Sequence, residues 1–354
     1  MNLQVVNLIY KNMKNFFLMT CLATFLLSAC SSEDENQTTP PLTGKESAAL
    51  TIRIVGSDRP KLTGSPTQVE ENEIQRYKVY VFDDNEQLEK VQEFSSNPSF
   101  TQTISDLTVG YKVIIIVANA PASFPVFSIK DEYMKFADEG SYINLDDQVD
   151  LSNGLTMSGQ SAISLSPSPA LNTIDITLKR VVAKIKLGDI TLDPEQGHNG
   201  VFTLQRVHIT RAMSMSLIGI PGFTAQEPFY GGIEGTAVTA PNVRNYLSES
   251  ISLADHADRY FYVFSNAGPR DKATIITLEG IYDGTLSYFP FRINDDETGD
   301  GEYIKPNTQH TINVVIKRPG SGSPDPEVPL DKATLQVTVT PEDWAVVLTQ
   351  NLEW

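Results

Sequence analysis

The sequence predicts an all-β protein built from two β-sandwich domains. Short segments in which apolar and polar residues alternate recur between turn residues, at the spacing typical of sandwiches. The chain has 354 residues, which is long for one sandwich and sufficient for two cores. Within residues 174–187 the alternation gains an extra residue at Val181-Val182, which indicates a bulge or a handover between two sheets. We therefore expect one domain over residues 50–180 and a second over residues 181–318.

Residues 1–30 have the layout of a signal peptide. Lys11 and Lys14 precede an apolar run that is too short to span a membrane. The sequence LSAC that follows, ending at Cys30, resembles the lipobox of bacterial lipoproteins, in which the Cys is acylated, for example with palmitate, and becomes the first residue after cleavage. This resemblance implies lipidation at Cys30 and a place in the outer membrane. Residues 31–49 are polar and without periodicity, which predicts a flexible leader.

The charge and the cysteine content limit the classes of partner and chemistry. The formal net charge is −17, and the Lys and Arg residues are intermixed with acidic ones rather than clustered. This pattern argues against binding nucleic acid through its phosphates and favours an acidic, solvated surface. Cys21 lies inside the apolar run of the signal and would be lost with it, so the mature chain is expected to contain neither a disulfide nor a reactive thiol.

The first domain is expected to open with a short strand at residues 50–55, followed by an exposed loop at residues 56–64. Arg59 and Lys61 lie in this loop, where a protease could reach them. Further strands are expected at 77–82, 88–94, 100–104 and 111–120. The first two of these form a predicted hairpin, and the last is almost continuously apolar, as expected of a central strand covered on both faces. A capping pair and a terminal Gly predict one helix at residues 128–140.

The second domain is expected to contain another run of short strands. We expect residues 202–209 to pair with residues 181–187. A long, aromatic-containing loop follows at residues 213–235, and such loops usually serve packing or binding. Alternation predicts further strands at 260–264, 274–282, 286–293 and 311–316. Residues 319–354 are expected to form a Pro- and Gly-rich linker and two C-terminal strands, at 333–339 and 344–349.

The sequence shows no pattern typical of an enzyme or of a cofactor site. The four histidines are scattered without metal-ligand spacing, and no nucleophile elbow, phosphate-binding loop or dinucleotide fingerprint occurs. The acidic pairs lie at predicted turns, where Asp favours local backbone hydrogen bonds. Residues 296–307 partly match a calcium loop, but Asn307 stands where the bidentate Glu belongs. A plain acidic hairpin loop is therefore favoured over a calcium site.

Several segments together resemble the Bacteroidales fimbrillins, the lipoprotein precursors of type V pili. The resemblance covers nearly the whole chain in the family's order. It rests on the lipobox at Cys30, residues 77–82 with their Asp-Asn turn, residues 113–120, the LKRVVAKI strand at 178–185, residues 304–310, and the terminal VTV followed by Trp344. The resemblance implies two transthyretin-like β-sandwich domains, export to the cell surface as a lipoprotein, proteolytic removal of the first strand by a trypsin-like protease, and polymerisation with other fimbrial subunits through donated strands.

One departure from the family pattern concerns the processing site. Such a protease normally cuts after an Arg, but Arg59 is followed by Pro60, whose ring obstructs cleavage. Lys61 and Arg53 are the alternative candidates, although Arg53 lies within the predicted first strand. The sequence therefore leaves open whether the chain is a processed stalk or tip subunit, or an anchor that keeps its first strand.

The physical case for strand exchange is a matching pattern at the two ends of the chain. Leu50, Ile52 and Ile54 would form one apolar face of the strand that is removed. The donor strand would need the same alternation, which two C-terminal segments supply: Leu335, Val337 and Val339, and then Trp344, Val346 and Leu348. Alternatively, both C-terminal strands complete the second domain's own sheet. A different class of function is a monomeric surface lipoprotein that binds glycan or a host ligand, with the loop aromatics Phe223, Phe229 and Tyr230 as stacking platforms for glycan.

Overall fold

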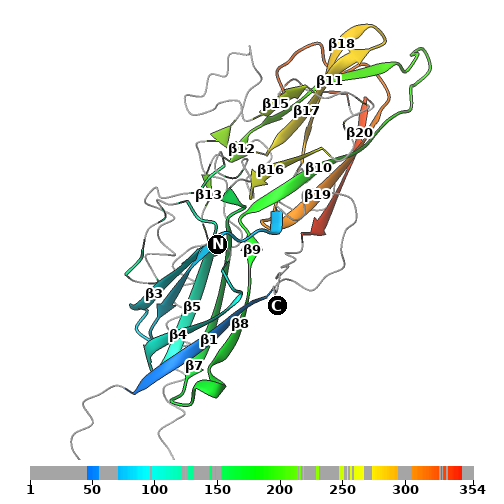
Figure 1. The fold of residues 1–354 in the computed structure, drawn as a ribbon. Helices are drawn as coiled ribbons and strands as arrows, with labels where there is room; N and C mark the ends of the chain where they lie inside the picture. Colours follow the sequence, from blue (N-terminus) through cyan, green and yellow to red (C-terminus); the bar gives the residue numbers. More distant parts are fainter. Residues whose placement is uncertain are drawn as a thin grey trace, which may run out of the picture. The chain divides into compact units, whose positions relative to one another are not determined.

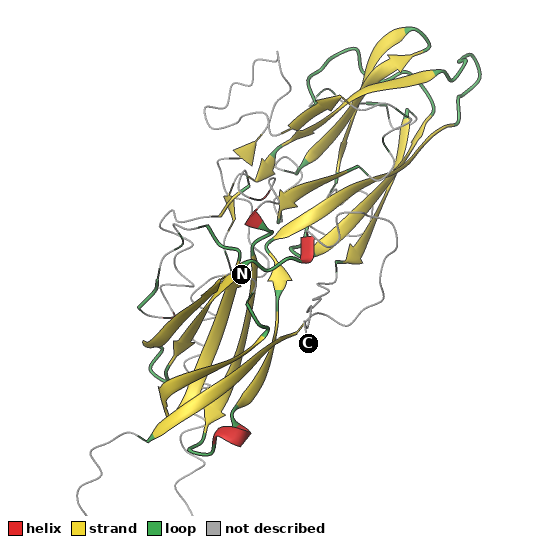
Figure 2. Ribbon diagram, in the orientation of Figure 1, coloured by secondary structure: helices red, strands yellow, loops and turns green. Residues whose placement is uncertain are grey.

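The computed structural model confirms the all-β class (Figures 1 and 2). It describes residues 46–55, 71–95, 98–121, 153–213, 259–266, 273–293, 304–326 (with 328, 330 and 331) and 334–344, together with shorter stretches between them. Residues Lys45–Trp354 form one compact unit, and the description below concerns this unit. Among the described residues, no helix is both long and apolar enough to cross a membrane.

Two sheets form the first group of strands (Figure 1). The five-stranded sheet has the order β3 (Leu88–Ser95), β2 (Arg76–Phe82), β5 (Gly110–Ala118), β7 (Met157–Leu165) and β9 (Lys179–Arg180). The three-stranded sheet has the order β4 (Thr101–Thr108), β1 (Ser47–Val55) and β8 (Thr173–Thr177). In the smaller sheet β1 is central, antiparallel to β4 and parallel to β8. The apolar alternation of β1 explains its place, because one face of the strand is buried and the other is not.

Two four-stranded sheets form the second group. One has the order β16 (Tyr260–Phe264), β10 (Val182–Leu192), β19 (Thr308–Ile316) and β20 (Leu335–Asp343). The other has the order β15 (Leu247–Ser250), β11 (Phe202–Thr210), β17 (Ile275–Tyr282) and β18 (Thr285–Arg292). Shorter elements are the pair β12 (Ala212–Met213) and β14 (Phe229–Tyr230), the pair β13 (Met215–Ser216) and β6 (Ile143–Asn144), and the 3-10 turn η2 (Pro169–Leu171).

The handover between sheets predicted at Val181-Val182 is confirmed by the strand pairing. β8 lies in the three-stranded sheet, β9 joins the five-stranded sheet, and β10 enters a sheet of the second group. Leu178, Val181 and Val182 are all buried, so the extra residue in the alternation accompanies a change in which face the chain buries. The domain limits proposed from the sequence themselves stay predictions.

The predicted pairing of residues 202–209 with residues 181–187 is wrong. β11 pairs with β15 and β17, whereas β10 is flanked by β16 and, in parallel, by β19. Sequence adjacency favoured a hairpin, but long-range strands occupy both edges of β10. The strand β7 was not predicted either. Its sequence MSGQSAISL buries only its first and last residues, so the alternation that marks other strands is weak.

Several predictions fall largely outside the described residues. Of the predicted helix at 128–140, only Ser128 and Lys130 are described, so the helix is not confirmed. The loop at 56–64 and the strand at 344–349, except Trp344, also lie outside them. The central position predicted for residues 111–120 is confirmed, because β5 pairs on both edges and Ile114, Ile115 and Ile116 are fully buried. Alternating residues point to opposite faces of a strand, so this burial covers both faces of β5.

Candidate functional site

The first strand fills a groove between two partner strands. Leu50, Ile52 and Ile54 of β1 are 0%, 1% and 5% exposed, so the apolar face predicted for this strand lies in the core. β1 pairs with β4 on one edge and with β8 on the other (Figure 1). Burying three large aliphatic side chains stabilises the strand by roughly 1.5 to 3 kcal/mol each. Removing β1 would expose the core beneath it and two rows of main-chain groups.

The outer face of β1 contributes less to holding the strand. Arg53 and Asp175 form a bidentate ion pair, with Nε 2.6 Å and Nη2 3.0 Å from the two carboxylate oxygens. About half of each side chain is exposed, and surface pairs of this kind contribute little to stability.

The candidate cleavage sites differ in how they can be judged from the structure. Arg53 lies inside a strand that is paired on both edges, which makes it a poorer cleavage site than a loop residue. Arg59 and Lys61 lie outside the described residues, as does Cys30.

A buried asparagine closes one end of the groove. The Asn172 Nδ2 donates to the main-chain carbonyls of Ala49, at 3.0 Å, and Ser166, at 2.8 Å. Its Oδ1 accepts from the Ser166 N–H at 2.9 Å, and its own carbonyl accepts from the Thr51 N–H at 2.8 Å. Asn172 is fully buried, so each of these bonds replaces one that water would otherwise make. The side chain thus ties the start of β1 to the chain that leads into β8.

The C-terminal strand lies at the edge of its own sheet. β20 pairs antiparallel with β19 over nine residues, from Thr308↔Asp343 to Ile316↔Leu335. Leu335, Val337 and Val339 pack against the core but stay half-buried. The monomer therefore has the alternative arrangement considered from the sequence, in which this strand completes the second group's sheet. Trp344, next along the chain, is buried, and Val346 and Leu348 lie outside the described residues.

A cluster around Arg180 joins segments that are far apart in the sequence. The Arg180 guanidinium donates to the main-chain carbonyl of Trp344 at 3.0 Å and to that of Glu71 at 3.2 Å, and it also hydrogen-bonds the Asn72 side chain. Its Cζ lies 4.0 Å from the centroid of the Trp344 ring, a cation–π contact. The Arg180 N–H donates to the Asn307 side chain at 3.0 Å. Burial lowers the pKa of Arg180 to about 10, so the guanidinium stays charged at neutral pH.

A second buried cation lies beside this cluster. Lys184 Nζ is 2.8 Å from the Glu71 Oε1, which also accepts from the Tyr262 hydroxyl at 2.7 Å. Burial lowers the pKa of Lys184, while the Glu71 carboxylate opposes that shift. Burial, together with the neighbouring Glu71, raises the pKa of the Tyr262 phenol and keeps it a donor. Tyr262 stacks on Trp344 with ring centroids 5.8 Å apart.

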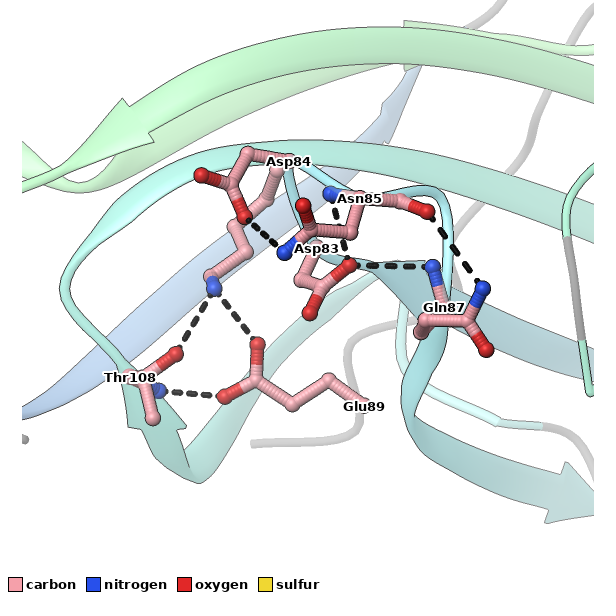
Figure 3. Close-up of polar contacts among 7 residues, drawn as sticks. Asp83, Asp84, Asn85, Gln87, Glu89 and Thr108 are labelled. Carbon is pink, nitrogen blue, oxygen red and sulfur yellow. Dashed lines mark hydrogen bonds and ion pairs between the residues drawn. The ribbon is translucent and has the colours of Figure 1, made fainter.

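The Asp-Asn turn after β2 is a local hydrogen-bonded structure (Figure 3). The Asp83 Oδ1 accepts from the main-chain N–H groups of Asn85 and Gln87, both at 2.9 Å. This is the turn chemistry expected of Asp. Burial raises the pKa of Asp83, but the hydrogen bonds from Asn85 and Gln87 together outweigh it and lower that pKa below its ordinary value. The acidic residues of this turn therefore stabilise the hairpin of β2 and β3.

Beside this turn, a buried ion pair joins β3 and β5, and the last residue of β4 hydrogen-bonds both of its members (Figure 3). Lys112 Nζ lies 2.6 Å from the Glu89 carboxylate and donates to the Thr108 hydroxyl at 2.8 Å. The Thr108 N–H donates to the same carboxylate. Burial would raise the pKa of Glu89, but these bonds outweigh it and hold that pKa below its ordinary value.

The described residues do not bring together a metal site. No group of three or more His, Cys, Asp or Glu among them could hold an ion. Of the acidic loop at 296–307, only the last four residues are described, and the Asn307 side chain already accepts from Arg180. The side chains of the loop aromatics Phe223, Phe229 and Tyr230 lie outside the described residues.

Sequence reasoning named Arg180 only as a boundary and did not find its cluster. The one local signal was a cation in an apolar stretch, which is as typical of a solvated position as of a buried one. Its partners come from residues 71–72, 307 and 344, and only the fold brings these segments together.

Comparison with known proteins connects this fold to fimbriae. Residues 48–199 match the family described as major fimbrial subunit protein (FimA). A fimbrilin from Porphyromonas gingivalis W83 is 16% identical with a TM-score of 0.65, covering 85% of this chain and 99% of that chain. A candidate cell adhesion protein from Bacteroides eggerthii is 23% identical with a TM-score of 0.65, covering 85% of this chain and 97% of that chain. No curated protein sequence matches.

A third similar structure is the tip fimbrial protein Mfa3 from Porphyromonas gingivalis with a C-terminal truncation. It is 16% identical with a TM-score of 0.50, covering 84% of this chain and 99% of that chain. At these identities the solved structures show a shared fold. The matching family is one of structural fimbrial subunits and not of enzymes. Residues 48–199 are therefore similar in sequence to the major fimbrial subunit proteins, and the chain shares the fold of the Porphyromonas gingivalis fimbrilin, as the sequence resemblance implied.

Proposed function

We propose that this chain is a structural subunit of a surface fimbria, a type V pilus that supports adhesion, and that it polymerises by strand exchange. In this proposal a trypsin-like protease removes β1, and the C-terminal strand of a neighbouring subunit takes its place. The chain would reach the surface as an outer-membrane lipoprotein precursor lipidated at Cys30. The family match supports the fimbrial role, and the processing and exchange steps go beyond it.

The observation that carries the exchange step is the position of β1. This strand precedes the other described strands of the compact unit, yet it lies in the middle of its sheet, with β4 and β8 on either side. Its loss would leave a groove the length of one strand, with an apolar floor and two unpaired edges. An extended strand from another chain would satisfy both.

The donor strand is supported by its edge position and its pattern. Among the described strands β20 has a partner on one side only, so it can leave without breaking into the interior of that sheet. Leu335, Val337 and Val339 repeat the two-residue spacing of Leu50, Ile52 and Ile54. In the new position these side chains would move from half-buried to buried, which favours exchange by the additional apolar area removed from water.

Two alternatives are weighed against this proposal. An anchor subunit would keep β1, which would leave its groove filled and its C-terminal strand the only exchangeable element. A monomeric glycan-binding lipoprotein would use a surface site instead. The described residues contain a hollow of about 510 Å³ lined in part by Arg76, Lys78 and Glu93. The Arg76 guanidinium already donates to the Ala120 carbonyl, at 2.9 Å, so this hollow offers less to a sugar than its composition suggests.

The test is the size of the purified chain before and after limited trypsin treatment. We expect the intact chain to stay monomeric and the cleaved chain to form a ladder of oligomers that resists dissociation. A chain that lacks residues 331–354 is the matched control and is expected to be cleaved without forming the ladder. Cleaved full-length protein that stays monomeric at high concentration rejects strand exchange. If trypsin does not cleave the chain at all, the result favours an anchor subunit that keeps β1.

A further inference from the structure

Arg180 connects the first strand to the C-terminal strand. Building on the proposed function, we propose that Arg180 holds β20 in its own sheet for as long as β1 fills its groove, so that loss of β1 releases the donor strand. The arrangement would keep a precursor from exchanging strands before it is processed. It makes Arg180 a positioning residue for assembly.

The first part of the argument is how Arg180 holds the end of the C-terminal strand. In the described part of the chain β20 has a sheet partner on one side, β19, so it would leave by peeling from an end. Trp344 stands at one such end, and Arg180 binds both its carbonyl and its ring. The Trp344 N–H donates to the Asn307 carbonyl at 3.1 Å, and the Asn307 side chain in turn accepts from the Arg180 N–H. Arg180 therefore fixes Trp344 both directly and through Asn307.

The second part is how β1 reaches Arg180 through β8. Of the strands that the structure describes, β8 lies at the edge of the three-stranded sheet and β1 is its only ladder partner there. The pairing runs to Val55↔Thr177, three residues before Arg180. Only the two-residue strand β9, paired with β7, lies between this ladder and the handover. Loss of β1 would therefore leave β8 without a ladder immediately before the residue that binds Trp344.

The third part lies on the far side of the predicted cleavage loop. Val55 is the last residue of β1, and the described chain resumes at Glu71 and Asn72. These two residues supply a carbonyl and a side-chain oxygen to the Arg180 guanidinium. Glu71 also binds Lys184 and Tyr262. Residues on both sides of the segment that would be cut thus act on Arg180, one through β8 and the other directly.

The other end of β20 has separate contacts that do not involve β1. Arg318 pairs with Glu195, at 2.7 Å, and with Asp331, at 3.0 Å, and the N–H of Lys317 donates to the Thr334 carbonyl at 2.9 Å. Ser321, in the predicted linker, exchanges two main-chain hydrogen bonds with Tyr288. This end is held whether or not the groove is filled. It supplies a matched comparison for the Arg180 end.

The test measures amide hydrogen exchange of residues 335–344 in the full-length, uncleaved chain. Ile52→Ala loosens β1 without cutting it, and Arg180→Lys keeps the charge but removes the fork that reaches Trp344, Glu71 and Asn72. We expect each variant to speed hydrogen exchange of this segment by roughly tenfold or more. This is the change expected when a cation–π contact and a charge-assisted hydrogen bond to Trp344 are lost. In the double variant, Ile52→Ala should add little to Arg180→Lys, because both act through the same contact.

Matched variants separate this effect from general instability. Ile116→Ala removes an equally buried residue from β5 and should leave exchange of residues 335–344 unchanged. Asp331→Asn loosens the other end of β20, and its effect should add to that of Ile52→Ala. If Arg180→Lys does not fold, Trp344→Ala replaces it in the same comparison. Two results would overturn the proposal: hydrogen exchange of residues 335–344 that is unchanged by Ile52→Ala, or effects of Ile52→Ala and Arg180→Lys that add fully in the double variant.

A parallel size measurement keeps this proposal distinct from the proposed function. If cleaved chains form the oligomer ladder but amide hydrogen exchange of residues 335–344 does not respond to changes in β1, then polymerisation by strand exchange stands and the role of Arg180 is rejected. If amide hydrogen exchange of residues 335–344 responds to changes in β1 but the cleaved chains form no ladder, then the coupling through Arg180 stands and polymerisation is rejected.

Discussion

The guanidinium carbon of Arg180 lies 4.0 Å from the centroid of the Trp344 ring, and the same group donates to the Trp344 carbonyl at 3.0 Å. The two residues are 164 positions apart in the sequence. Both side chains are buried, so the contact is shielded from solvent and from screening by salt. The contact links the handover between the two groups of sheets to the end of the C-terminal strand. In the proposed assembly, it therefore links the region next to the removed strand β1 to the donor strand β20.

Ile52→Ala should weaken the hold of β1. The side chain is buried and the strand is paired on both edges, so the substitution leaves a cavity and should lower the free energy of unfolding by about 2 to 5 kcal/mol. Urea unfolding followed by circular dichroism measures this loss. Arg53→Ala is the matched variant on the exposed face of the same strand and should cost less than about 1 kcal/mol. Equal losses in the two variants would mean that the apolar face does not hold the strand.

Asn172→Asp should open one end of the groove with almost no change in shape. The substitution removes the Nδ2 that donates to the carbonyls of Ala49 and Ser166 and places an acceptor against them. Leaving buried groups unpaired costs about 1 to 3 kcal/mol each, more for a charge. Thermal unfolding and the rate of proteolysis within residues 46–55 measure the change. A variant with unchanged melting and unchanged proteolysis would show that Asn172 does not anchor β1.

Glu89 should make stability depend on pH in the acid range. Its pKa in the folded protein is below the ordinary value of 4.5, so its contribution to stability is fully present above that value. The contribution is lost as the pH falls through the lowered folded pKa, because protonation breaks the pair with Lys112. Glu89→Gln should therefore be less stable than the wild type at pH 7 and approach it as the pH falls below about 4. Parallel stability curves across this range would contradict the assignment.

Cys30→Ala should block lipidation, because the sulfur is the atom that would carry the lipid. We expect the precursor to keep its signal peptide and to be absent from the outer membrane. Mass spectrometry of the cell fractions, with metabolic labelling by a fatty acid, measures both. Ser28→Thr, two residues earlier, is the matched control and should be processed. Normal surface display of Cys30→Ala would show that the lipobox-like sequence has no such role.

Strands with a clear local pattern could be predicted from the sequence. Leu50, Ile52 and Ile54 alternate with polar residues, and the run at Ile114 is apolar on both faces, so β1 and β5 followed from periodicity alone. The change of sheet at Val181 was equally local, because an extra apolar residue in an alternation has few structural explanations.

Pairing partners and buried polar contacts could not be predicted in this way. The partner of β10 in parallel is β19, which begins more than 100 residues later, and no pattern within either strand encodes that choice. Ser- and Gly-rich β7 lacks the alternation that would have marked it. Arg180 and Glu71 were missed for the same reason, since charged residues are mostly exposed and only the fold brings their partners within reach.

The most direct test of strand exchange mixes two chains that each lack one half of the reaction. The acceptor is cleaved and ends before residue 331, so it has a groove but no donor strand. The donor is the full-length chain with Arg59→Gln, Lys61→Gln and Arg180→Lys. It keeps β1, so it has no open groove, and it lacks the contact that is proposed to hold its C-terminal strand. Size-exclusion chromatography with light scattering gives the mass of each chain alone and of the mixture. Strand exchange predicts that both are monomers alone and that the mixture forms a one-to-one heterodimer and nothing larger. A donor that polymerises by itself, or a mixture that contains only monomers, would contradict it.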